Sequence, residues 1–184
     1  MTAPPPGADP FRRLTHVDEH GKAHMVDVTG KAVTRRVAEA RCSVRSAGDV
    51  TAVLRHPPGG ADLLETARVA GIMAAKRTPT LVPLCHPLLL DGFDVDVAVV
   101  PDGFDVRAVT SVVERTGVEM EALTACAAAA LVLVQAMLEV DPTASVEDLT
   151  LWHKSGGRSG VWERSAVGRH VDRIGTSQEH TGLP

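Results

Sequence analysis

A long apolar helix that directly follows two alternating strands most limits how this chain can fold. Gly117 to Val140 is rich in Ala, Leu and Val, has no charge between residues 126 and 134, and stops at Asp141-Pro142. Before it, Phe93 to Val100 and Phe104 to Val113 alternate apolar and polar residues on either side of Asp102-Gly103, which is typical of a β-hairpin. A helix this apolar needs cover, so we expect it to pack on the sheet that contains the hairpin.

Three further elements complete the pattern. Val37 to Ser46 alternates as a strand, Asp62 to Lys76 has Leu63, Ala67, Ala70 and Ala74 on one helical stripe, and Val146 to His153 is a last strand. The order βαββαβ predicts an α+β, ferredoxin-like fold, in which an antiparallel sheet carries both helices on one face. The other face would expose the Val-rich hairpin, which would favour oligomerisation.

The length of 184 residues fits one domain with short tails. Residues 1–12 are proline-rich and are predicted to be a disordered lead, residues 13–160 form the domain, and residues 161–184 are a polar, flexible tail.

Charge and composition exclude several functions. A net charge of -4 and an isoelectric point near 6.0 argue against nucleic-acid binding, which needs a basic face. No apolar run approaches the roughly 20 residues of a membrane span, and the N-terminal residues lack an apolar signal-peptide centre. We therefore expect a cytoplasmic protein that does not act at membranes. Three widely spaced cysteines fit neither a disulfide framework nor a metal site, so no metal or cofactor is expected.

Four local patterns are candidates for chemistry. Glu119 and Glu121 either cap the long helix or face a site, because acids are favourable at any helix N-terminus. His86, beside Cys85 and two prolines, is either a buried structural histidine or an imidazole that exchanges protons near neutral pH. Lys76 ends the first helix, where a cation is favourable with or without a ligand. The loop of residues 154–160 is either a flexible basic loop or an anion cradle.

The chain resembles the MoaC family, the cyclic pyranopterin monophosphate synthases of molybdenum cofactor biosynthesis. The resemblance covers about residues 14 to 160, and its four motifs occur in the family's order. They are Leu14-Thr15-His16 with Ala23 to Val28; Thr66 to Thr78 leading to Pro83 to Leu88; Thr116 to Ala125; and Lys154 to Gly160.

The resemblance implies a ferredoxin-like subunit in a hexamer built as a trimer of dimers, with sites at the dimer interface. The family converts 3',8-cyclo-7,8-dihydro-GTP into cyclic pyranopterin monophosphate and pyrophosphate. The positions that match catalytic or substrate-binding residues of the family, or lie in matching context, are Asp27, Arg36, Lys76, Leu84, Cys85, His86, Glu119, Met120, Glu121 and Lys154. In that reaction lysines would hold the triphosphate, and His86 and Glu121 would move protons.

Three positions depart from the family pattern. Gln135 stands where the family has a catalytic aspartate, Leu138 stands where a lysine follows one turn later, and Gly60 stands where a catalytic lysine precedes the first helix. Glutamine cannot act as a base and leucine cannot stabilise an anion. Three hypotheses follow: a working synthase with replaced groups such as Glu139, a paralogue with another reaction on a nucleotide-like substrate, or a non-catalytic partner in mixed oligomers.

Overall fold

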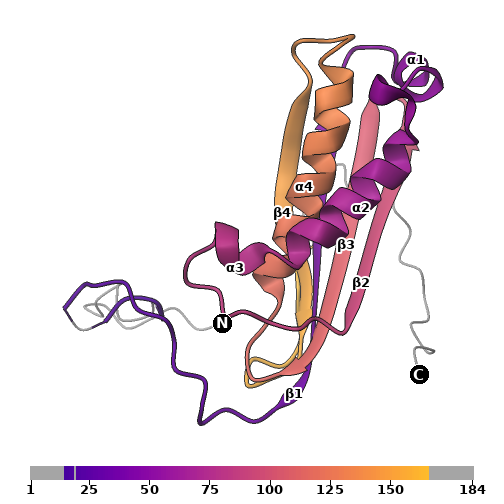
Figure 1. Ribbon diagram of the computed structural model, residues 1–184. Coiled ribbons are helices and arrows are strands. Elements are labelled where there is room, and N and C mark those ends of the chain that lie inside the picture. The colour runs from indigo at the N-terminus through magenta and orange to yellow at the C-terminus, as the bar shows by residue number, and fades with distance from the viewer. Residues whose placement is uncertain (1–14, 19, 166–184) are drawn as a thin grey trace.

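The computed structural model describes residues 15–18 and 20–165 and shows a sheet with helices on one face (Figure 1). The sheet is antiparallel, and its strand order is β2-β3-β1-β4-β5. The strands are β1 (Thr34–Arg45), β2 (Gly92–Val100), β3 (Gly103–Glu114), β4 (Ser145–Ser155) and β5 (Trp162–Glu163). The first four strands have the order and direction of the ferredoxin-like fold, so the predicted fold class is confirmed.

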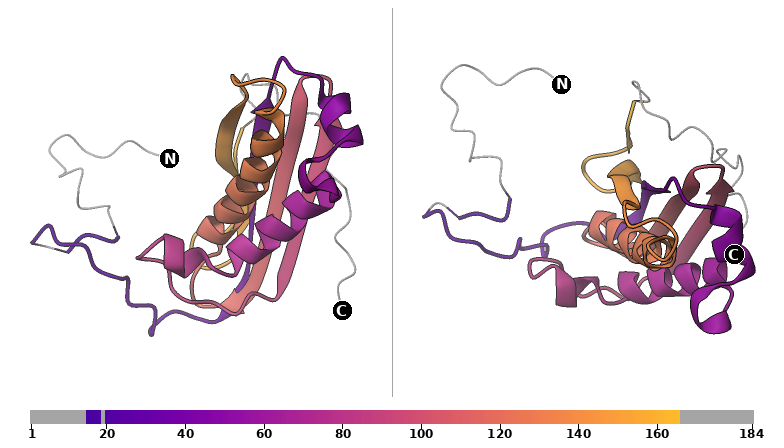
Figure 2. Two further views of the ribbon diagram at one scale, coloured as in Figure 1. Left: turned by 45° about the horizontal axis from the view of Figure 1, so that its top comes forward. Right: turned by 90° about the horizontal axis from the view of Figure 1, so that it is seen from above.

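The helices are α1 (Val50–Arg55), the 3-10 turn η2 (Pro58–Gly60), α2 (Leu63–Ala75), α3 (Thr78–Leu81) and α4 (Glu119–Met137). The two long helices, α2 and α4, lie side by side on the same face of the sheet (Figure 2). Asp62 begins α2 because its carboxylate accepts hydrogen bonds from the Leu64 and Glu65 amides.

Three short elements differ from the sequence-based expectation. The six-residue α1 is too short to show a helical period, although Asp49 caps it through the Thr51 and Ala52 amides. The four-residue α3 is likewise too short to be expected, and Pro79 occupies its first turn, where its missing N–H costs nothing. The predicted lead at residues 1–12 lies outside the described residues. At the start of the predicted tail, Trp162 and Glu163 form β5 instead of continuing as free chain.

Small side chains let α4 lie close to the sheet. Alternate residues of β1 face the helices, namely Ala38, Ala40, Cys42 and Val44, and all four are fully buried. They meet the alanines of α4, of which Ala122, Ala125 and Ala129 are also buried. The buried stripe of α2 is Leu63, Ala67, Gly71 and Ala75. Its last two residues each lie one position after the predicted Ala70 and Ala74. The core therefore depends on close backbone approach and not on bulky filling.

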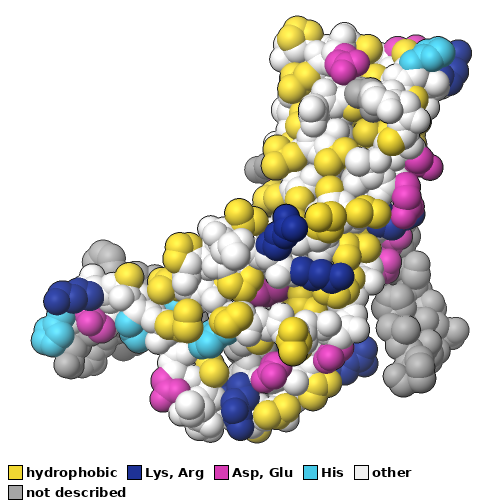
Figure 3. Space-filling model, in the orientation of Figure 1, with side chains coloured by type: hydrophobic (Ala, Val, Ile, Leu, Met, Phe, Trp, Pro, Cys, Tyr) yellow, Lys and Arg dark blue, Asp and Glu magenta, His cyan; other side chains and the backbone are white. Residues whose placement is uncertain are grey.

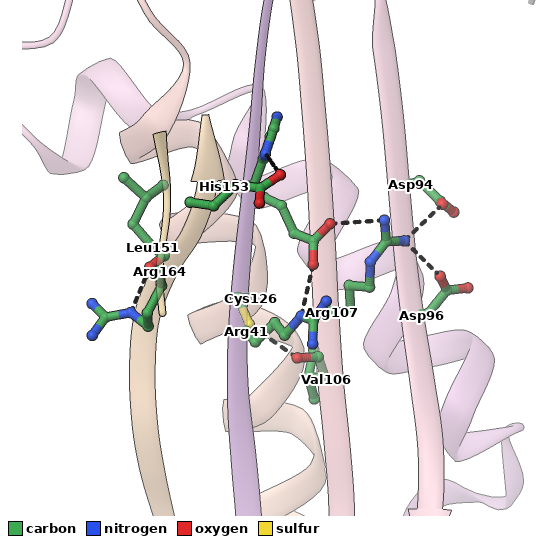
Figure 4. A network of polar contacts seen from close by, with 11 residues as sticks. Arg41, Asp94, Asp96, Val106, Arg107, Cys126, Leu151, His153 and Arg164 are labelled. Atoms are coloured by element: carbon green, nitrogen blue, oxygen red, sulfur yellow. Dashed lines mark hydrogen bonds and ion pairs between the residues drawn. The ribbon is translucent and has the colours of Figure 1, made fainter. Parts of the chain in front are cut away.

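The open face of the sheet is charged, so the expectation of an exposed valine-rich surface there is wrong. Glu39 on β1 binds Arg41 at 2.6 Å and Arg107 on β3 at 2.9 Å. Arg107 also meets Asp94 and Asp96 on β2, at 3.5 Å and 3.3 Å (Figure 4). Burial opposes ionisation of Glu39, but the hydrogen bonds from Arg107 and Arg41 outweigh it and lower the Glu39 pKa. Cross-strand charge pairs of this kind stabilise a sheet face that no helix covers.

Helix α4 is long and apolar enough to cross a membrane, judged by length and composition alone. Half of that stretch is buried, and the helix contacts β1, β3 and β4 along its course. These contacts are those of the core helix of a globular domain.

Candidate active site

A cavity of about 440 Å³ opens where several elements begin or end. The start of β1, the end of β3, the end of β4 and the first turn of α4 meet there, and the loop after α3 closes one side. This volume lies within the range of small-molecule sites. The lining is Thr15, His16, Val26, Lys31, Arg36, Val37, Leu84, Cys85, His86, Leu88, Arg115, Thr116, Gly117, Glu119, Met120, Glu121, Lys154, Ser155, Gly156 and Ser159.

Helix α4 presents its first turn to this cavity. No side chain caps the helix at Val118, and the Thr110 hydroxyl instead donates to the Val118 carbonyl at 3.0 Å, which anchors the helix start to β3. Glu121 is 3% exposed, and burial, with a smaller contribution from the nearby Glu119 carboxylate, raises the Glu121 pKa to about 7. A carboxyl group with a pKa of about 7 can accept or donate a proton at physiological pH.

Cationic side chains also line the cavity. Arg36 donates from Nε to the Glu114 carbonyl at 3.3 Å and from Nη2 to the Arg115 carbonyl at 3.1 Å. Arg115 in turn donates from Nε to the Lys31 carbonyl at 3.2 Å. Lys154 Nζ lies 3.1 Å from Glu119 Oε1. The cavity thus holds four cationic and two acidic side chains among the described residues, an excess of positive charge that suits a polyanionic ligand.

The segment Leu84-Cys85-His86 reaches the cavity from the turn after α3. The Cys85 amide donates to the Val82 carbonyl at 3.0 Å, which turns the chain toward α4. Burial raises the Cys85 pKa, and the carboxylates of Glu121 and Glu119 raise it further. The Cys85 side chain is therefore a neutral thiol at physiological pH, which leaves Glu121 as the carboxyl group that can exchange a proton on this side.

Most of the predicted site residues line this one cavity. They are Arg36, Leu84, Cys85, His86, Glu119, Met120, Glu121 and Lys154. The cavity lining also includes His16 and Ser159, which lie in motifs noted in the sequence, and Lys31 and Arg115, which the sequence pattern did not single out. A lone cation such as Lys31 gives no sequence signal, although Arg115 could have been suspected because it directly precedes the Thr116-Gly117 motif.

Three predicted site residues lie outside the cavity of their own chain. Asp27 is exposed, and the Thr29 amide and hydroxyl hydrogen-bond its carboxylate and lower its pKa. Lys76 is exposed at the end of α2, and its Nζ lies 5.2 Å from the centroid of the Phe93 ring. Gln135 is exposed on α4, 14 residues beyond Glu121, or about 21 Å along the helix axis.

The other two residues that depart from the family pattern, Gly60 and Leu138, are also exposed. Gly60 is exposed at the end of η2, with a φ of +70°, and a Cβ added there would meet no atom within 4 Å. Leu138 is 47% exposed just past α4. Gly60, Gln135 and Leu138 are thus all exposed on the surface of this chain.

His16 and His24 lie on neighbouring antiparallel segments, because the His24 amide donates to the His16 carbonyl at 3.0 Å and Val17 pairs with Ala23. Over residues 15–18 and 20–165, no group of three or more His, Cys, Asp or Glu side chains is placed to hold a metal ion.

Comparison with known proteins identifies the family of this chain. The sequence model of the MoaC family matches residues 25–157. The chain is 51% identical over 161 residues to the cyclic pyranopterin monophosphate synthase of Streptomyces coelicolor, across 86% of this chain and 94% of that protein. It is 52% identical over 162 residues to the synthase of Nocardioides sp., across 85% and 99%, and 50% identical over 163 residues to cyclic pyranopterin monophosphate synthase 2 of Mycobacterium tuberculosis, across 86% and 96%. With the fold, the cavity motifs and these relatives in agreement, the chain belongs to the MoaC family.

Proposed function

We propose that this protein is a lyase and cyclase of the MoaC type. It converts 3',8-cyclo-7,8-dihydro-GTP into cyclic pyranopterin monophosphate and pyrophosphate during molybdenum cofactor biosynthesis. The observation that carries the proposal is the meeting of Lys154, His86 and Glu121 in one cavity of suitable size. Identity of about half of all aligned residues to proteins named as this synthase supports it.

The cationic, proton-transferring and apolar residues of the cavity have different roles in this reaction. Lys154, Arg36 and the neighbouring cations hold the triphosphate and stabilise the charge that develops on the leaving pyrophosphate. Glu121 and His86 move protons as the ring opens and the pterin closes. Leu84, Leu88 and Met120 supply apolar surface for the ring system.

The substituted positions favour a second candidate function. Gly60, Gln135 and Leu138 cannot supply the base and cations of the family reaction. A paralogue that binds a nucleotide-like substrate for another reaction, or a non-catalytic partner of an intact synthase, would keep the cavity and lose these groups. The specific observation in favour of this second candidate is a contrast between two sets of positions. The cavity still holds residues that match the family, whereas the exposed positions 60, 135 and 138 lack the family's charged groups.

We further propose that the protein forms a homo-oligomer, a trimer of dimers, in the cytoplasm. The helix-covered face carries exposed apolar side chains on α2 and α4, among them Val69, Met73 and Leu131, which are 46%, 46% and 62% exposed (Figure 3). Gln135 and Leu138 belong to the same outer side of α4. A second subunit on this face would cover apolar area and bring the outward positions next to another cavity.

Incubation of the purified protein with 3',8-cyclo-7,8-dihydro-GTP tests the proposal directly. Release of pyrophosphate together with a fluorescent pterin after oxidation supports the synthase function, and Lys154→Met should abolish both signals. The Streptomyces coelicolor synthase is the positive control. Tight binding of the intermediate without turnover would contradict the synthase proposal and favour the second candidate.

A further inference from the structure

The end of β4 supplies the cavity with both a cation and a loop. Lys154 and Ser155 line the cavity, and the chain continues through a turn of residues 156–161 that returns Ser159 to the same cavity. Gly156 and Gly157 have φ values of +97° and +67°, and a Cβ on Gly157 would overlap the Arg36 guanidinium. The turn therefore packs directly against Arg36, a cation of the cavity lining.

Strand β4 is irregular just before this turn. Glu39 of β1 pairs with His153 and Ala40 pairs with Leu151, so Trp152 is skipped in the pairing with β1. The Trp152 ring covers the Arg41 guanidinium on the open face, 4.4 Å from it. Such a bulge bends a strand and weakens its ladder locally. Lys154 pairs again with Ala38 of β1 beyond the bulge, so the direction of Lys154 depends on both edges of β4.

Strand β5 holds the other edge of β4. Glu163 pairs with His153 and Trp162 pairs with Lys154, directly beside the bulge. The Arg164 amide donates to the Trp152 carbonyl at 2.8 Å, and Arg164 Nε donates to the Leu151 carbonyl at 2.9 Å (Figure 4). His153 Nδ1 lies 3.3 Å from Glu163 Oε1. These contacts tie both ends of the turn together across the bulge.

We propose that β5 and Arg164 form a clamp that holds Lys154 and the turn of residues 156–161 in the geometry that binds an anion. Arg164 is a positioning residue, since it acts through the Leu151 and Trp152 carbonyls and is absent from the cavity lining. The matched family region ends at residue 157, so the clamp lies beyond it. Only the identity of the anion, the pyrophosphate part of substrate and product, rests on the proposed function.

Hydrogen exchange and pyrophosphate binding together test the clamp on the full-length protein. Arg164→Ala should make the amides of residues 151–160 exchange several-fold faster and weaken binding of inorganic pyrophosphate about fivefold, the effect of one lost hydrogen bond. Arg55→Ala is the matched control, because Arg55 is also exposed and also donates from Nε to a backbone carbonyl, that of Thr51. It should leave both readouts as in wild type.

Arg164→Lys separates positioning from charge. It keeps the positive charge but not the planar Nε donor, so exchange should stay fast and pyrophosphate binding should stay weak. If Arg164→Lys binds pyrophosphate as tightly as wild type while its amides exchange fast, only the charge of residue 164 matters. If the amides of Arg164→Ala exchange as slowly as those of Arg55→Ala, no clamp exists. Either result overturns the proposal. Failure of wild type to bind pyrophosphate would count against the proposed function, while the exchange comparison would still decide the clamp.

Discussion

Lys154 at the end of β4 and Glu119 in the first turn of α4 form an ion pair in the cavity lining, with 3.1 Å between Nζ and Oε1. Both side chains are about one-third exposed, so water screens the pair and its contribution to stability is small. The pair instead affects the affinity for an anionic ligand, since an incoming phosphate competes with Glu119 for Lys154.

Opposite effects on anion binding are therefore expected from the two partners. Glu119→Gln should tighten pyrophosphate binding about three- to tenfold, because it removes a repelling carboxylate and releases Lys154. Lys154→Met should weaken binding at least about tenfold, because it removes a charge-assisted hydrogen-bond donor. Titration calorimetry at constant ionic strength measures both. Weaker binding by Glu119→Gln would mean that the carboxylate holds Lys154 in position and does not compete with the ligand.

Stability should fall with rising pH because of Glu121. Its folded-state pKa of about 7 lies above the ordinary value of 4.5, so the folded state binds this proton more tightly than the unfolded state does. The associated stabilisation is complete below about pH 4.5 and is lost as the pH rises through about 7. Glu121→Gln stays neutral and should be more stable than wild type at pH 8, by roughly 1–3 kcal/mol.

Urea unfolding at pH 5 and pH 8 checks this difference. Glu139→Gln, at an exposed position just past the same helix, is the control and should follow the wild-type profile. Parallel profiles for wild type and Glu121→Gln would show that Glu121 does not carry the pH dependence.

Restoring the family's residues should restore catalysis if the cavity is otherwise intact. The triple variant Gln135→Asp, Leu138→Lys and Gly60→Lys should turn over 3',8-cyclo-7,8-dihydro-GTP at least about tenfold faster than wild type. All three positions are on the surface, so the folding cost is confined to the left-handed backbone at Gly60, about 1 kcal/mol. The neutral variant Gln135→Asn, Leu138→Met and Gly60→Asn is the control. No gain in pyrophosphate release would indicate a cavity remodelled for another ligand.

Close packing of α2 on α4 should be sensitive to one added methyl group. A Cβ on Gly71 would lie 2.9 Å from the Ala125 carbonyl oxygen and 3.2 Å from Val95. Gly71→Ala should therefore destabilise the fold by about 1–3 kcal/mol, despite the better helix propensity of alanine. Gly30→Ala, where nothing lies within 4 Å of the new Cβ, should be nearly neutral. Thermal unfolding of both variants measures the difference, and equal midpoints would contradict the packing argument.

The long elements were predictable because each one repeats its signal over many residues. The alternation in β1, β2 and β3 and the apolar run of α4 specify burial residue by residue, and these elements occur where expected. The short α1 and α3 were missed, because four to six residues contain too little periodicity to outweigh a proline or a glycine. The charge of the open sheet face was also missed, because the Glu39–Arg107 pair joins two strands that are 68 residues apart in the sequence.

The site, like the fold, was predictable from the sequence only in part. Sequence alone was enough for the family, the fold class and the candidate status of His86, Glu121 and Lys154, because their motifs are local. It took the folded chain to show that these three share a cavity, that Lys31 and Arg115 join them, and that Gln135 lies about 21 Å further along α4 on the outer surface. Motifs record neighbours along the chain, whereas a cavity is made where the ends of distant strands and helices converge.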